Sequence, residues 1–468
     1  MFRKARHLHF VGIGGAGMSG IAEVLVNLGY RVSGSDLVTN LATRRLKRLG
    51  ATVYRGHGAV NVDVADVVVI STAVHEDNPE VVEARRRNIP VIPRAEMLAE
   101  LMRMKYGVAI AGAHGKTTTT AMVAEILTAG GLDPTVVIGG RIRTLRSGAK
   151  LGRGEMMVAE ADESDGSFLK MKPTIAVVTN IDREHLDHYG NLASIQDAFV
   201  QFLSRIPFYG AAIVCFDEPN VRAILPRVDR KLITYGLSSE ADVWASDVSL
   251  VQFGVSYVAR HHGVSLGPVR LQVPGRHSVY NSLAALAVGL ELDVQFATAT
   301  RALSRFRGVD RRFQLRGEAF GATVVDDYGH HPTEIAVTLA AAREGFGART
   351  VVVFQPHRYS RTQALLEEFG RSFFLADLVV VTEVYPAGET PIPGIDGRAV
   401  SDAVLRHGHP SVLYEPNLNE IPKLLRKLIK AGDLVLTLGA GDVWKVGEDL
   451  VRAGSVGSMG REYRRSRA

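Results

Sequence analysis

The stretch GVAIAGAHGKTTTTAMVAEILTAGG, residues 107–131, passes from an apolar run through a glycine-containing turn into a helical pattern. A buried strand that turns through glycines into a helix is typical of an α/β fold with a parallel sheet. Backbone N–H groups at the start of such a helix bind phosphate. Lys116 would neutralise the β- and γ-phosphates, and the hydroxyl of Thr117 would reach Mg²⁺. The stretch therefore predicts a P-loop that binds Mg·ATP.

This loop departs from the full G-x-x-x-x-G-K-T pattern, because Ile110 occupies the position of the first glycine. The effective pattern is G-x-x-G-K-T, beginning at Gly112. A chance turn is the alternative, but the flanking strand and helix favour the P-loop. The residues expected to contact ATP here are Gly112, Ala113, His114, Gly115, Lys116, Thr117 and Thr118.

The alternation of strand-like and helix-like runs extends in both directions over most of the 468 residues. The strand-like runs, such as DVVVIST and TIAVVTNID, are continuous stretches rich in Val and Ile, as burial on both faces of a sheet requires. Because the chain is too long for one ordinary core, we predict three consecutive α/β domains at residues 1–106, 107–312 and 313–468. Residues 242–275 are rich in Val, Ser and Gly, which predicts a small antiparallel insertion.

The composition argues against a membrane-spanning protein and excludes a framework of intrachain disulfides. Apolar residues make up 46 % and charged residues 22 %, and no apolar run reaches the ~18 residues that span a bilayer. The opening MFRKARHLHFVG runs into a glycine loop, so we expect a first strand and not a signal peptide. The single cysteine, Cys215, is typical of a reducing cytoplasm. The net charge of +6 does not distinguish anionic small molecules from nucleic acid.

A second glycine loop, HFVGIGGAGMSG, covers residues 9–20. Gly12, Gly14 and Gly17 match the G-x-G-x-x-G pattern of a dinucleotide-binding turn, and Asp36 lies about where a ribose-binding acid is expected. A nicotinamide-dependent dehydrogenase is therefore one hypothesis. It leaves the P-loop unexplained.

Clusters of polar residues follow three strand-like runs, at the sheet edge where α/β proteins build their sites. After MMVA come Glu160, Asp162, Glu163 and Asp165, whose mutual repulsion a Mg²⁺ ion would offset, although a solvated acidic loop is the simpler reading of that cluster alone. After TIAVV come Asp182, His185, Asp187 and His188, and after ATVV come Asp326, Asp327, His330 and His331. Both histidine pairs could be structural or bind Zn²⁺, but no cysteine assists and no H-E-x-x-H spacing is present.

A further basic cluster, FQPHRYSRT, contains His357, Arg358 and Arg361. If this stretch is helical, the two arginines lie one helical turn apart and can grip a single carboxylate or phosphate.

An ordered set of motifs in this chain resembles the Mur ligase family. The motifs are, in order, GIGGAGMSG, GAHGKTTTT, EADESD, TNID…HLDHYG, GRHSVYN, RGVDRRF, DDYGHHPTE and FQPHRYSRT. The matching motifs run from about Leu8 to Gly441 and resemble most closely the branch that adds alanine. The resemblance implies a Rossmann-like UDP-binding domain, a central P-loop ATPase-like domain and a Rossmann-like third domain. It also implies a cytoplasmic enzyme of peptidoglycan synthesis, a monomer or weak homodimer whose partners are small molecules and not nucleic acid.

The implied reaction couples the lactyl carboxylate of UDP-N-acetylmuramate to L-alanine, with ATP going to ADP and phosphate. The carboxylate would first attack the γ-phosphate to give an acyl phosphate, which the amine then attacks. Positioning and cationic stabilisation should supply most of the catalysis.

The resemblance assigns further roles residue by residue. Thr117 with Glu160 would hold a first Mg²⁺, and Glu160 with His185 a second; Mn²⁺ should also support activity because imidazole is an uncommon Mg²⁺ ligand. Additional nucleotide contacts would come from His277, Asn281, Arg312 and Asp327. The amino-acid site would contain Tyr328, His330, Arg358 and Arg361. The UDP-sugar would contact Gly12, Gly14, Gly15, Gly17, Asp36, Ser71 and Thr72.

One departure from the wider family is informative. Related ligases that add later amino acids carry a metal-binding carbamylated lysine in the helix after the histidine, whereas NLASIQDAFVQFL contains no lysine. The alanine-adding branch also lacks it, and the complete second metal shell is left open. The competing hypotheses are a relative that recycles cell-wall tripeptide and a non-enzymatic, ATP-switched binding protein.

Overall fold

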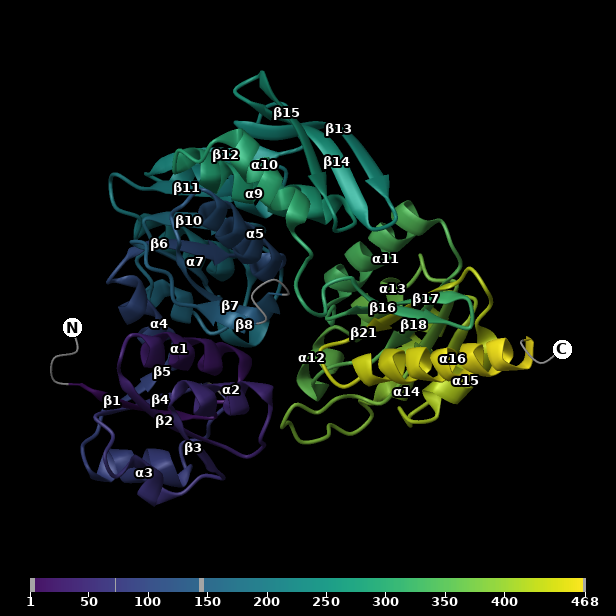
Figure 1. Ribbon diagram of the computed structural model, residues 1–468, viewed down its shortest axis with the longest axis horizontal. Helices are drawn as coiled ribbons and strands as arrows, with labels where there is room; N and C mark the ends of the chain where they lie inside the picture. The colour runs from purple at the N-terminus through teal and green to yellow at the C-terminus, as the bar shows by residue number, and fades with distance from the viewer. Residues whose placement is uncertain (1–4, 72, 143–146, 466–468) are drawn as a thin grey trace. The chain divides into compact units, whose positions relative to one another are not determined.

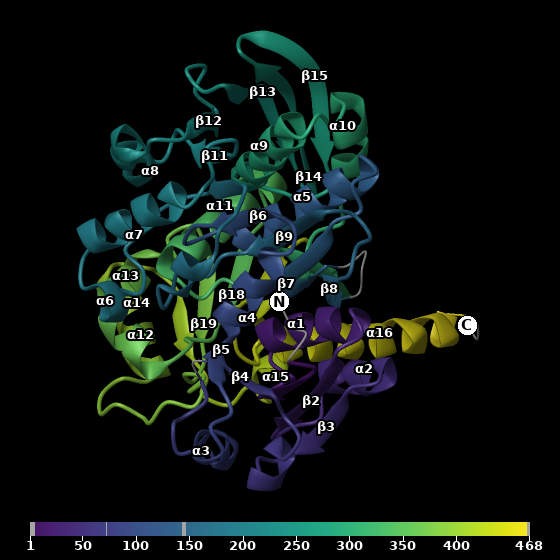
Figure 2. The same ribbon diagram turned by 90° about the vertical axis from the view of Figure 1, so that its left-hand side faces the viewer.

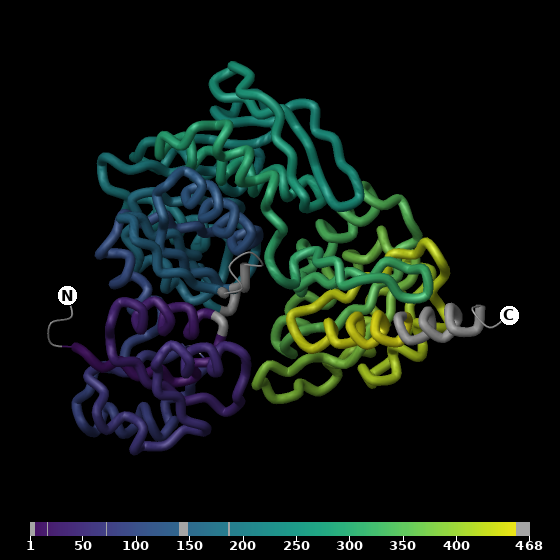
Figure 3. The backbone as a smooth tube through the Cα atoms, in the orientation of Figure 1, coloured from purple at the N-terminus to yellow at the C-terminus, as the bar shows by residue number. Residues whose placement is uncertain are grey.

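The computed structural model describes residues 5–71, 73–142 and 147–465. The chain, traced in Figure 3, forms two compact units. The first unit comprises Met1–Val248, Tyr257–Arg270 and Val279–Val309, and the second comprises Ser249–Ser256, Leu271–Ser278 and Asp310–Ala468. Three sheets form the framework of these units, which confirms three consecutive α/β folds; the domain boundaries at residues 106 and 312 stay predictions.

The first sheet has the order β3-β2-β1-β4-β5, and all its neighbouring strands are parallel. Its apolar strands are buried because helices pack against them. The strands are β1 (His7–Val11), β2 (Arg31–Asp36), β3 (Thr52–Arg55), β4 (Val67–Ile70) and β5 (Val91–Pro93). The helices are α1 (Ala16–Asn27), α2 (Leu41–Leu49), η1 (Ala59–Val62), α3 (Pro79–Arg86) and α4 (Arg94–Met102).

The second sheet has ten strands in the order β15-β14-β13-β12-β11-β10-β6-β9-β7-β8. They are β6 (Tyr106–Ala111), β7 (Thr135–Ile142), β8 (Ser147–Lys150), β9 (Met156–Glu160), β10 (Ile175–Val178), β11 (Ala211–Cys215), β12 (Lys231–Gly236), β13 (Val243–Val251), β14 (Gly254–His261) and β15 (Val264–Leu271). Two-residue turns join β13 to β14 and β14 to β15, which only antiparallel neighbours allow. The predicted antiparallel insertion thus extends the central sheet at one edge.

The helices that accompany the central sheet include the long α5, which begins at the P-loop lysine. They are α5 (Lys116–Ala129), η2 (Ser167–Lys170), α6 (Leu186–Tyr189), α7 (Leu192–Ser204), α8 (Pro219–Ile224), η3 (Leu225–Arg227), α9 (Arg276–Glu291) and α10 (Phe296–Arg305). Within the first unit, α1 lies beside β7 and β8 of the central sheet (Figures 1 and 2). Gly20 of α1 faces Ala149 of β8 at this contact.

The third sheet, in the second unit, has the order β16-β17-β21-β18-β19-β20 and is parallel except for the β16–β17 pair. Its strands are β16 (Gln314–Ala319), β17 (Ala322–Asp327), β18 (Thr350–Phe354), β19 (Leu378–Val381), β20 (Val412–Tyr414) and β21 (Leu434–Leu438). Its helices are α11 (Pro332–Phe346), α12 (Tyr359–Ala364), α13 (Leu366–Arg371), α14 (Gly397–Arg406), α15 (Ile421–Leu428) and α16 (Trp444–Arg465).

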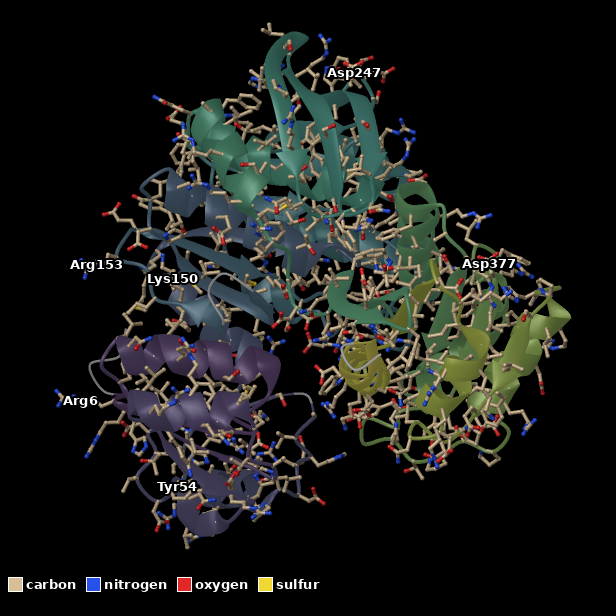
Figure 4. The ribbon with its side chains drawn as sticks, turned by 45° about the vertical axis from the view of Figure 1, so that its right-hand side comes forward. Arg6, Tyr54, Lys150, Arg153, Asp247 and Asp377 are labelled. Carbon is tan, nitrogen blue, oxygen red and sulfur yellow. The ribbon has the colours of Figure 1, made fainter. Side chains whose placement is uncertain are left out.

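Aspartates accept backbone N–H groups at the amino ends of β1 and β18, whereas the loops described below follow the carboxyl ends of strands. Asp66 accepts the backbone N–H groups of Arg6 and His7 at the start of β1, and Asp377 accepts that of Thr350 at the start of β18. Arg6 and Asp377 are labelled in Figure 4. Among the described residues, no helix combines the length and apolar character needed to cross a membrane.

Candidate functional site

The P-loop follows β6 with the strand, turn and helix order that the sequence predicts. Gly112 and Gly115 have φ angles of +129° and +80°, in the region that favours glycine. A side chain at Gly112 would also collide with the hydroxyl of Thr179. Both glycines are therefore required by the backbone itself, and Gly115 caps α5 directly before Lys116.

The loop that follows β10 holds the P-loop in place. Asn180 accepts the backbone N–H of His114 through its side-chain oxygen at 2.8 Å and donates its amide N–H to the carbonyl of His114 at 3.0 Å. The hydroxyl of Thr179 donates to the same carbonyl at 2.7 Å. Sequence reasoning passed over Asn180, although its position at a strand end beside the P-loop strand is a usable signal.

Lys116 is folded back onto its own loop and onto the acidic segment after β9. Its Nζ donates to the carbonyls of Gly112 and Ala113 and, at 2.8 Å, to Oε1 of Glu163. Burial lowers the pKa of Lys116, but the carboxylates of Glu163 and Asp162 more than offset it, so the pKa is raised. Lys116 is therefore a half-buried, charged group that already has a carboxylate beside it.

The acidic segment after β9 presents its carboxylates in different directions. Glu160, the last residue of β9, lies against Gly139, where a Cβ would be 2.7 Å from its Oε2. Asp162 accepts from Arg94 Nη2 at 3.1 Å. Burial raises the pKa of Asp162, but Lys116 and Arg94 overcome this and lower it. These carboxylates thus differ in their surroundings: Glu163 is buried, whereas the side chain of Asp162 is 41 % exposed.

His185 is the centre of a candidate cation site. One ligand atom each of Glu163, Glu184 and His185 lie within 4.8 Å of one another. His185 has φ of +55°, and such strained backbone concentrates at functional sites. Glu160 is not part of this group of three. Glu184 was missed by the sequence reasoning, although it precedes His185 directly.

The first glycine loop is held by the end of β2. The backbone N–H groups of Gly12 and Ile13 lie 2.8 and 3.0 Å from the carbonyl oxygen of Ser35. The N–H of Gly14 donates to Oδ2 of Asp36 at 2.8 Å. Asp36 therefore orients the loop itself, in addition to any contact with a ligand.

Other predicted UDP-sugar residues lie around this loop. Gly15 is exposed as the N-cap of α1, and a Cβ at Gly17 would lie 2.6 Å from Nη1 of Arg94. Ser71 is half-buried just after β4, and Thr72 lies outside the described residues. Arg94, which no motif indicated, is the cation nearest to Gly17.

A buried polar network around Glu80 holds Ser35, the residue whose carbonyl accepts the N–H groups of the first glycine loop. The hydroxyl of Ser35 donates to Oε2 of Glu80 at 2.5 Å, and Asn61 donates to Oε1 at 2.6 Å. His9 Nε2 and His57 Nδ1 lie 3.6 and 3.4 Å from the same carboxylate. Burial raises the pKa of Glu80, but the hydrogen bonds have the larger effect and lower the pKa to about 2. Glu80 is thus an ionised anchor of the strand that carries Ser35.

The predicted additional nucleotide contacts are divided between the two units. Asn281 on α9, in the first unit, accepts from the hydroxyl of Thr119 at 3.2 Å, and a Cβ at Gly115 would lie 2.7 Å from its Oδ1. Asn281 thus lies directly against the P-loop. His277 and Arg312 belong to the second unit, where burial and Arg312 lower the pKa of His277 to about 4.

The loop after β17 gathers the predicted third-unit residues. Asp327 is buried and accepts the N–H groups of Phe313 and Gly329, both at 2.7 Å. Arg312 donates to Glu334 at 3.2 Å and lies over the ring of Tyr328. Both oxygens of Asp327 thus serve the loop backbone, which adds a structural role to its predicted nucleotide contact.

Hydrogen bonds fix opposite tautomers on two neighbouring imidazoles, His330 and His357, whose ring centroids are 5.7 Å apart. His330 Nδ1 lies 3.0 Å from the carbonyl of Tyr328, so Nδ1 carries the proton and Nε2 is free to accept. His357 Nδ1 faces the guanidinium of Arg361 at 3.3 Å, so Nδ1 accepts. Burial lowers the pKa of His330 to about 3 and that of His357 to about 4. Both rings are neutral near pH 7.

The two predicted arginines differ in backbone setting. Helix α12 begins at Tyr359, so Arg361 is helical while Arg358 is the N-cap residue with φ of +70°. The helical spacing predicted for the two arginines is therefore wrong, because Arg358 does not have helical backbone; their binding of one anion stays a prediction. Arg358 is instead fixed by its N–H bond to the carbonyl of Tyr385 at 2.9 Å.

Comparison with known proteins covers nearly the whole chain. The model of the Mur ligase family, catalytic domain, matches residues 7–106; the Mur ligase middle domain matches 110–289; and the Mur ligase, glutamate ligase domain matches 311–441. The UDP-N-acetylmuramate–L-alanine ligase of Geobacter sp. strain M21 is 58 % identical, over 96 % of this chain and 98 % of the relative. The ligase of the same name from Myxococcus xanthus is 57 % identical, over 96 % and 95 %.

Solved structures agree. The crystal structure of the UDP-N-acetylmuramate–alanine ligase of Thermotoga maritima superposes with a TM-score of 0.81 at 31 % identity and covers 95 % of this chain and 98 % of that one. A murein peptide ligase of Psychrobacter arcticus gives 0.72 at 25 % identity, covering 96 % and 98 %. With three domain models in order and relatives that match from end to end, the chain belongs to the Mur ligase family.

Proposed function

We propose that this chain is an ATP-dependent ligase that joins L-alanine to the lactyl carboxylate of UDP-N-acetylmuramate, a step of peptidoglycan precursor synthesis. The observation that carries the proposal is the identity of 58 and 57 %, over 96 % of the chain, to curated relatives named for this reaction. ATP goes to ADP and phosphate. The lactyl carboxylate attacks the γ-phosphate, ADP leaves, and the alanine amine displaces phosphate from the resulting acyl phosphate.

The P-loop supplies the site for ATP in this proposal. The N–H groups of residues 112–118 surround the phosphates, and Lys116 exchanges Glu163 for the β- and γ-phosphates. Asn281 supports the site because it packs against Gly115. His277, Arg312 and Asp327 would add contacts from the second unit.

Divalent cations fit the residues on this edge of the central sheet. The donors are carboxylate oxygens and one imidazole, and Oε2 of Glu163 is buried without a hydrogen-bond partner. Thr117 with Glu160 would hold one Mg²⁺, and Glu160 with His185 another. Bound there, Mg²⁺ would offset the negative charge of the transferring phosphoryl group. The imidazole ligand supports the expectation that Mn²⁺ substitutes.

The first glycine loop is proposed to bind the diphosphate of the UDP-sugar, with Gly12, Gly14, Gly15 and Gly17 allowing close approach. Asp36 holds the loop and would also contact the uridine, and Ser71 and Thr72 would line the site. This loop follows a Rossmann-like strand, so a dinucleotide was a competing ligand. Membership in the Mur ligase family favours the UDP-sugar.

The second unit is proposed to hold L-alanine. Arg358 and Arg361 would bind its carboxylate, and Tyr328 would line the pocket. His330 supports this assignment because its free Nε2 lone pair can accept a hydrogen bond from the alanine amino group. With a pKa of about 3 it would orient the amine as an acceptor, since so weak a base would not hold the proton.

Phosphate release from the purified chain tests the proposal. We expect release only when UDP-N-acetylmuramate, ATP and L-alanine are all present, with glycine and L-serine poorer substrates. Release that ignores muramyl nucleotide and amino acid would overturn the ligase assignment and favour an ATP-switched binding protein.

A recycling ligase that attaches a preformed tripeptide is the second candidate, because the murein peptide ligase of Psychrobacter arcticus shares the fold over 96 % of this chain. The tripeptide L-Ala-γ-D-Glu-meso-diaminopimelate belongs in the same amino-acid panel. Faster turnover with it than with L-alanine would favour recycling.

The proposal also places the enzyme in the cytoplasm as a monomer or weak homodimer. Sedimentation can check the oligomeric state.

A further inference from the structure

Glu163 stands where a phosphate oxygen is expected to stand. It approaches Lys116 Nζ at 2.8 Å, while the same ammonium group donates to two carbonyls of the P-loop. The P-loop lysine is thus fully occupied by the protein's own groups. A nucleotide phosphate that binds Lys116 has to displace one of these three acceptors, and Glu163 is the one whose negative charge it would repel.

Glu163 has a second carboxylate oxygen that does not bind Lys116. Its Oε2 is buried and has no hydrogen-bond partner, and the residue is only 4 % exposed. One oxygen of Glu163 also belongs to the group with Glu184 and His185, within 4.8 Å. Glu184 Oε2 lies 3.7 Å from His185 Nε2, so these side chains face one another.

Once a phosphate takes Lys116, Glu163 would be a buried carboxylate without its cation, which is strongly unfavourable. A cation placed between Glu163, Glu184 and His185 would restore that compensation. The hydroxyl of Tyr189 donates to the backbone carbonyl of Glu163 at 2.5 Å and so ties the Glu163 segment to the segment that carries His185. The two segments are therefore joined before any ligand arrives.

We propose that Glu163 is a shared ligand: it is the counter-ion of Lys116 without nucleotide, and it holds a divalent cation with Glu184 and His185 once nucleotide phosphate occupies Lys116. Metal binding at His185 then depends on nucleotide binding through one carboxylate. This inference rests on the proposed function, because it takes ATP to be the ligand of the P-loop. No covalent bond is made or broken in the exchange.

Mn²⁺ binding to the full chain tests the exchange without reference to catalysis. Electron paramagnetic resonance counts free Mn²⁺, the hyperfine coupling of a ring ¹⁴N identifies ions bound to an imidazole, and loss of this coupling in His185→Ala assigns it to His185. We expect weak binding without nucleotide and an imidazole-coordinated Mn²⁺ once a non-hydrolysable ATP analogue is added. Glu163→Gln, nearly the same size, should weaken that ion by roughly tenfold or more, in line with losing one carboxylate ligand.

Replacing Lys116 allows a second experiment, which tests the same exchange without nucleotide. Lys116→Met should release Glu163 and so raise Mn²⁺ affinity at His185 in the absence of nucleotide, and adding Glu163→Gln to it should cancel the gain. Glu155→Gln is the matched control, because Glu155 is exposed at the opposite end of β9. It removes one charge directly before the same strand and should leave Mn²⁺ binding unchanged.

Two results would overturn the proposal: Mn²⁺ affinity that Lys116→Met leaves at the wild-type value, or an imidazole-coordinated Mn²⁺ that Glu163→Gln retains. Binding of a fluorescent ATP analogue, measured separately, distinguishes this failure from failure of the proposed function. A chain that binds no nucleotide would refute the function, while the lysine-free arm would still decide the exchange. Circular dichroism melting confirms that each variant is folded.

Discussion

The first glycine loop and the P-loop share a strand, turn and helix geometry but differ in the groups that hold them. The first loop is fastened by the carbonyl of Ser35 and the carboxylate of Asp36, and it carries no charge of its own. The P-loop carries Lys116, and the acid that holds this lysine comes from another strand. A loop that only binds a diphosphate needs donors in fixed positions, whereas one that transfers a phosphoryl group also needs movable charge.

A third turn of this kind, Gly439–Gly441 before α16, shows what geometry alone provides. There the side chain of Gln355 accepts the N–H groups of Asp442 and Val443 at 2.7 and 3.1 Å. The helix start is therefore already satisfied by the protein. A glycine turn before a helix therefore does not by itself indicate a ligand site.

The comparison predicts its largest effect at Lys116. Lys116→Ala should reduce ligation by at least about 10³-fold, because it removes the cation that stabilises the transferring phosphoryl group. Phosphate release with all three substrates measures the loss, and Lys170→Ala, an exposed lysine paired with Glu96, is the control. Near wild-type turnover in Lys116→Ala would mean that the P-loop holds no transferable phosphate.

Glu160 tests whether the edge of the central sheet holds a catalytic metal. Glu160→Gln should lower kcat by about 10²- to 10³-fold at saturating Mg²⁺. The metal loses one charged ligand, and the other ligands do not make up for it. The fitted Mg²⁺ dependence of phosphate release is the measurement. If turnover recovers completely at high Mg²⁺, Glu160 affects only metal affinity.

Arg361 extends the comparison to the second unit, where the expected effect is on binding. Arg361→Ala should raise the KM for L-alanine by about ten- to a hundredfold, equivalent to the ~1.5–3 kcal/mol of a charge-assisted hydrogen bond. The KM values for ATP and UDP-N-acetylmuramate should stay within about twofold. An equal rise in all three would indicate a structural defect, which a melting curve would also reveal.

Asp36 is the counterpart of Lys116 in the uncharged loop, and a smaller effect is expected there. Asp36→Asn keeps an acceptor for Gly14 but loses its charge, so the KM for UDP-N-acetylmuramate should rise about tenfold with kcat unchanged. Asp63→Asn, an exposed acid of the same domain paired with Arg87, is the control. A fall in kcat with unchanged KM would contradict a purely binding role for this loop.

The smallest effect concerns acid stability. His277, His330 and His357 in the second unit have folded pKa values of about 4, 3 and 4, below the unfolded value of 6.5. The unfolded chain therefore binds more protons, and their contribution to stability, complete above pH 6.5, is lost as pH falls toward 4. For Glu80 in the first unit, the loss falls between 4.5 and about 2.

Scanning calorimetry between pH 7 and 4 should therefore show a melting temperature that falls as the pH is lowered. His277→Asn should reduce this fall, because one of the three neutral imidazoles is gone. A melting temperature that does not change over this range would show that these rings are protonated in the folded chain.

The sequence was most informative where one strand leads into one loop. The strand order could not be read from it, but the P-loop, Glu160 and His185 could, because each follows a run of buried Val, Ile or Ala. Partnerships between distant segments were not visible. Nothing near Lys116 in the sequence indicates Glu163 as its partner, and the left-handed backbone of Arg358 has no local signature. Such features arise from tertiary contacts, which local patterns do not encode.

Asp162 and Glu163 are neighbours in the chain, yet they hold cations at two different loops. Asp162 pairs with Arg94, beside Gly17 of the first loop, and Glu163 pairs with Lys116 of the P-loop. Because the two residues are adjacent, a phosphate that displaces one carboxylate changes the electrostatic potential at the other. Thermodynamic linkage makes any coupling between the two loops reciprocal. Two adjacent carboxylates thus connect the ion pair beside Gly17 with the ion pair of the P-loop.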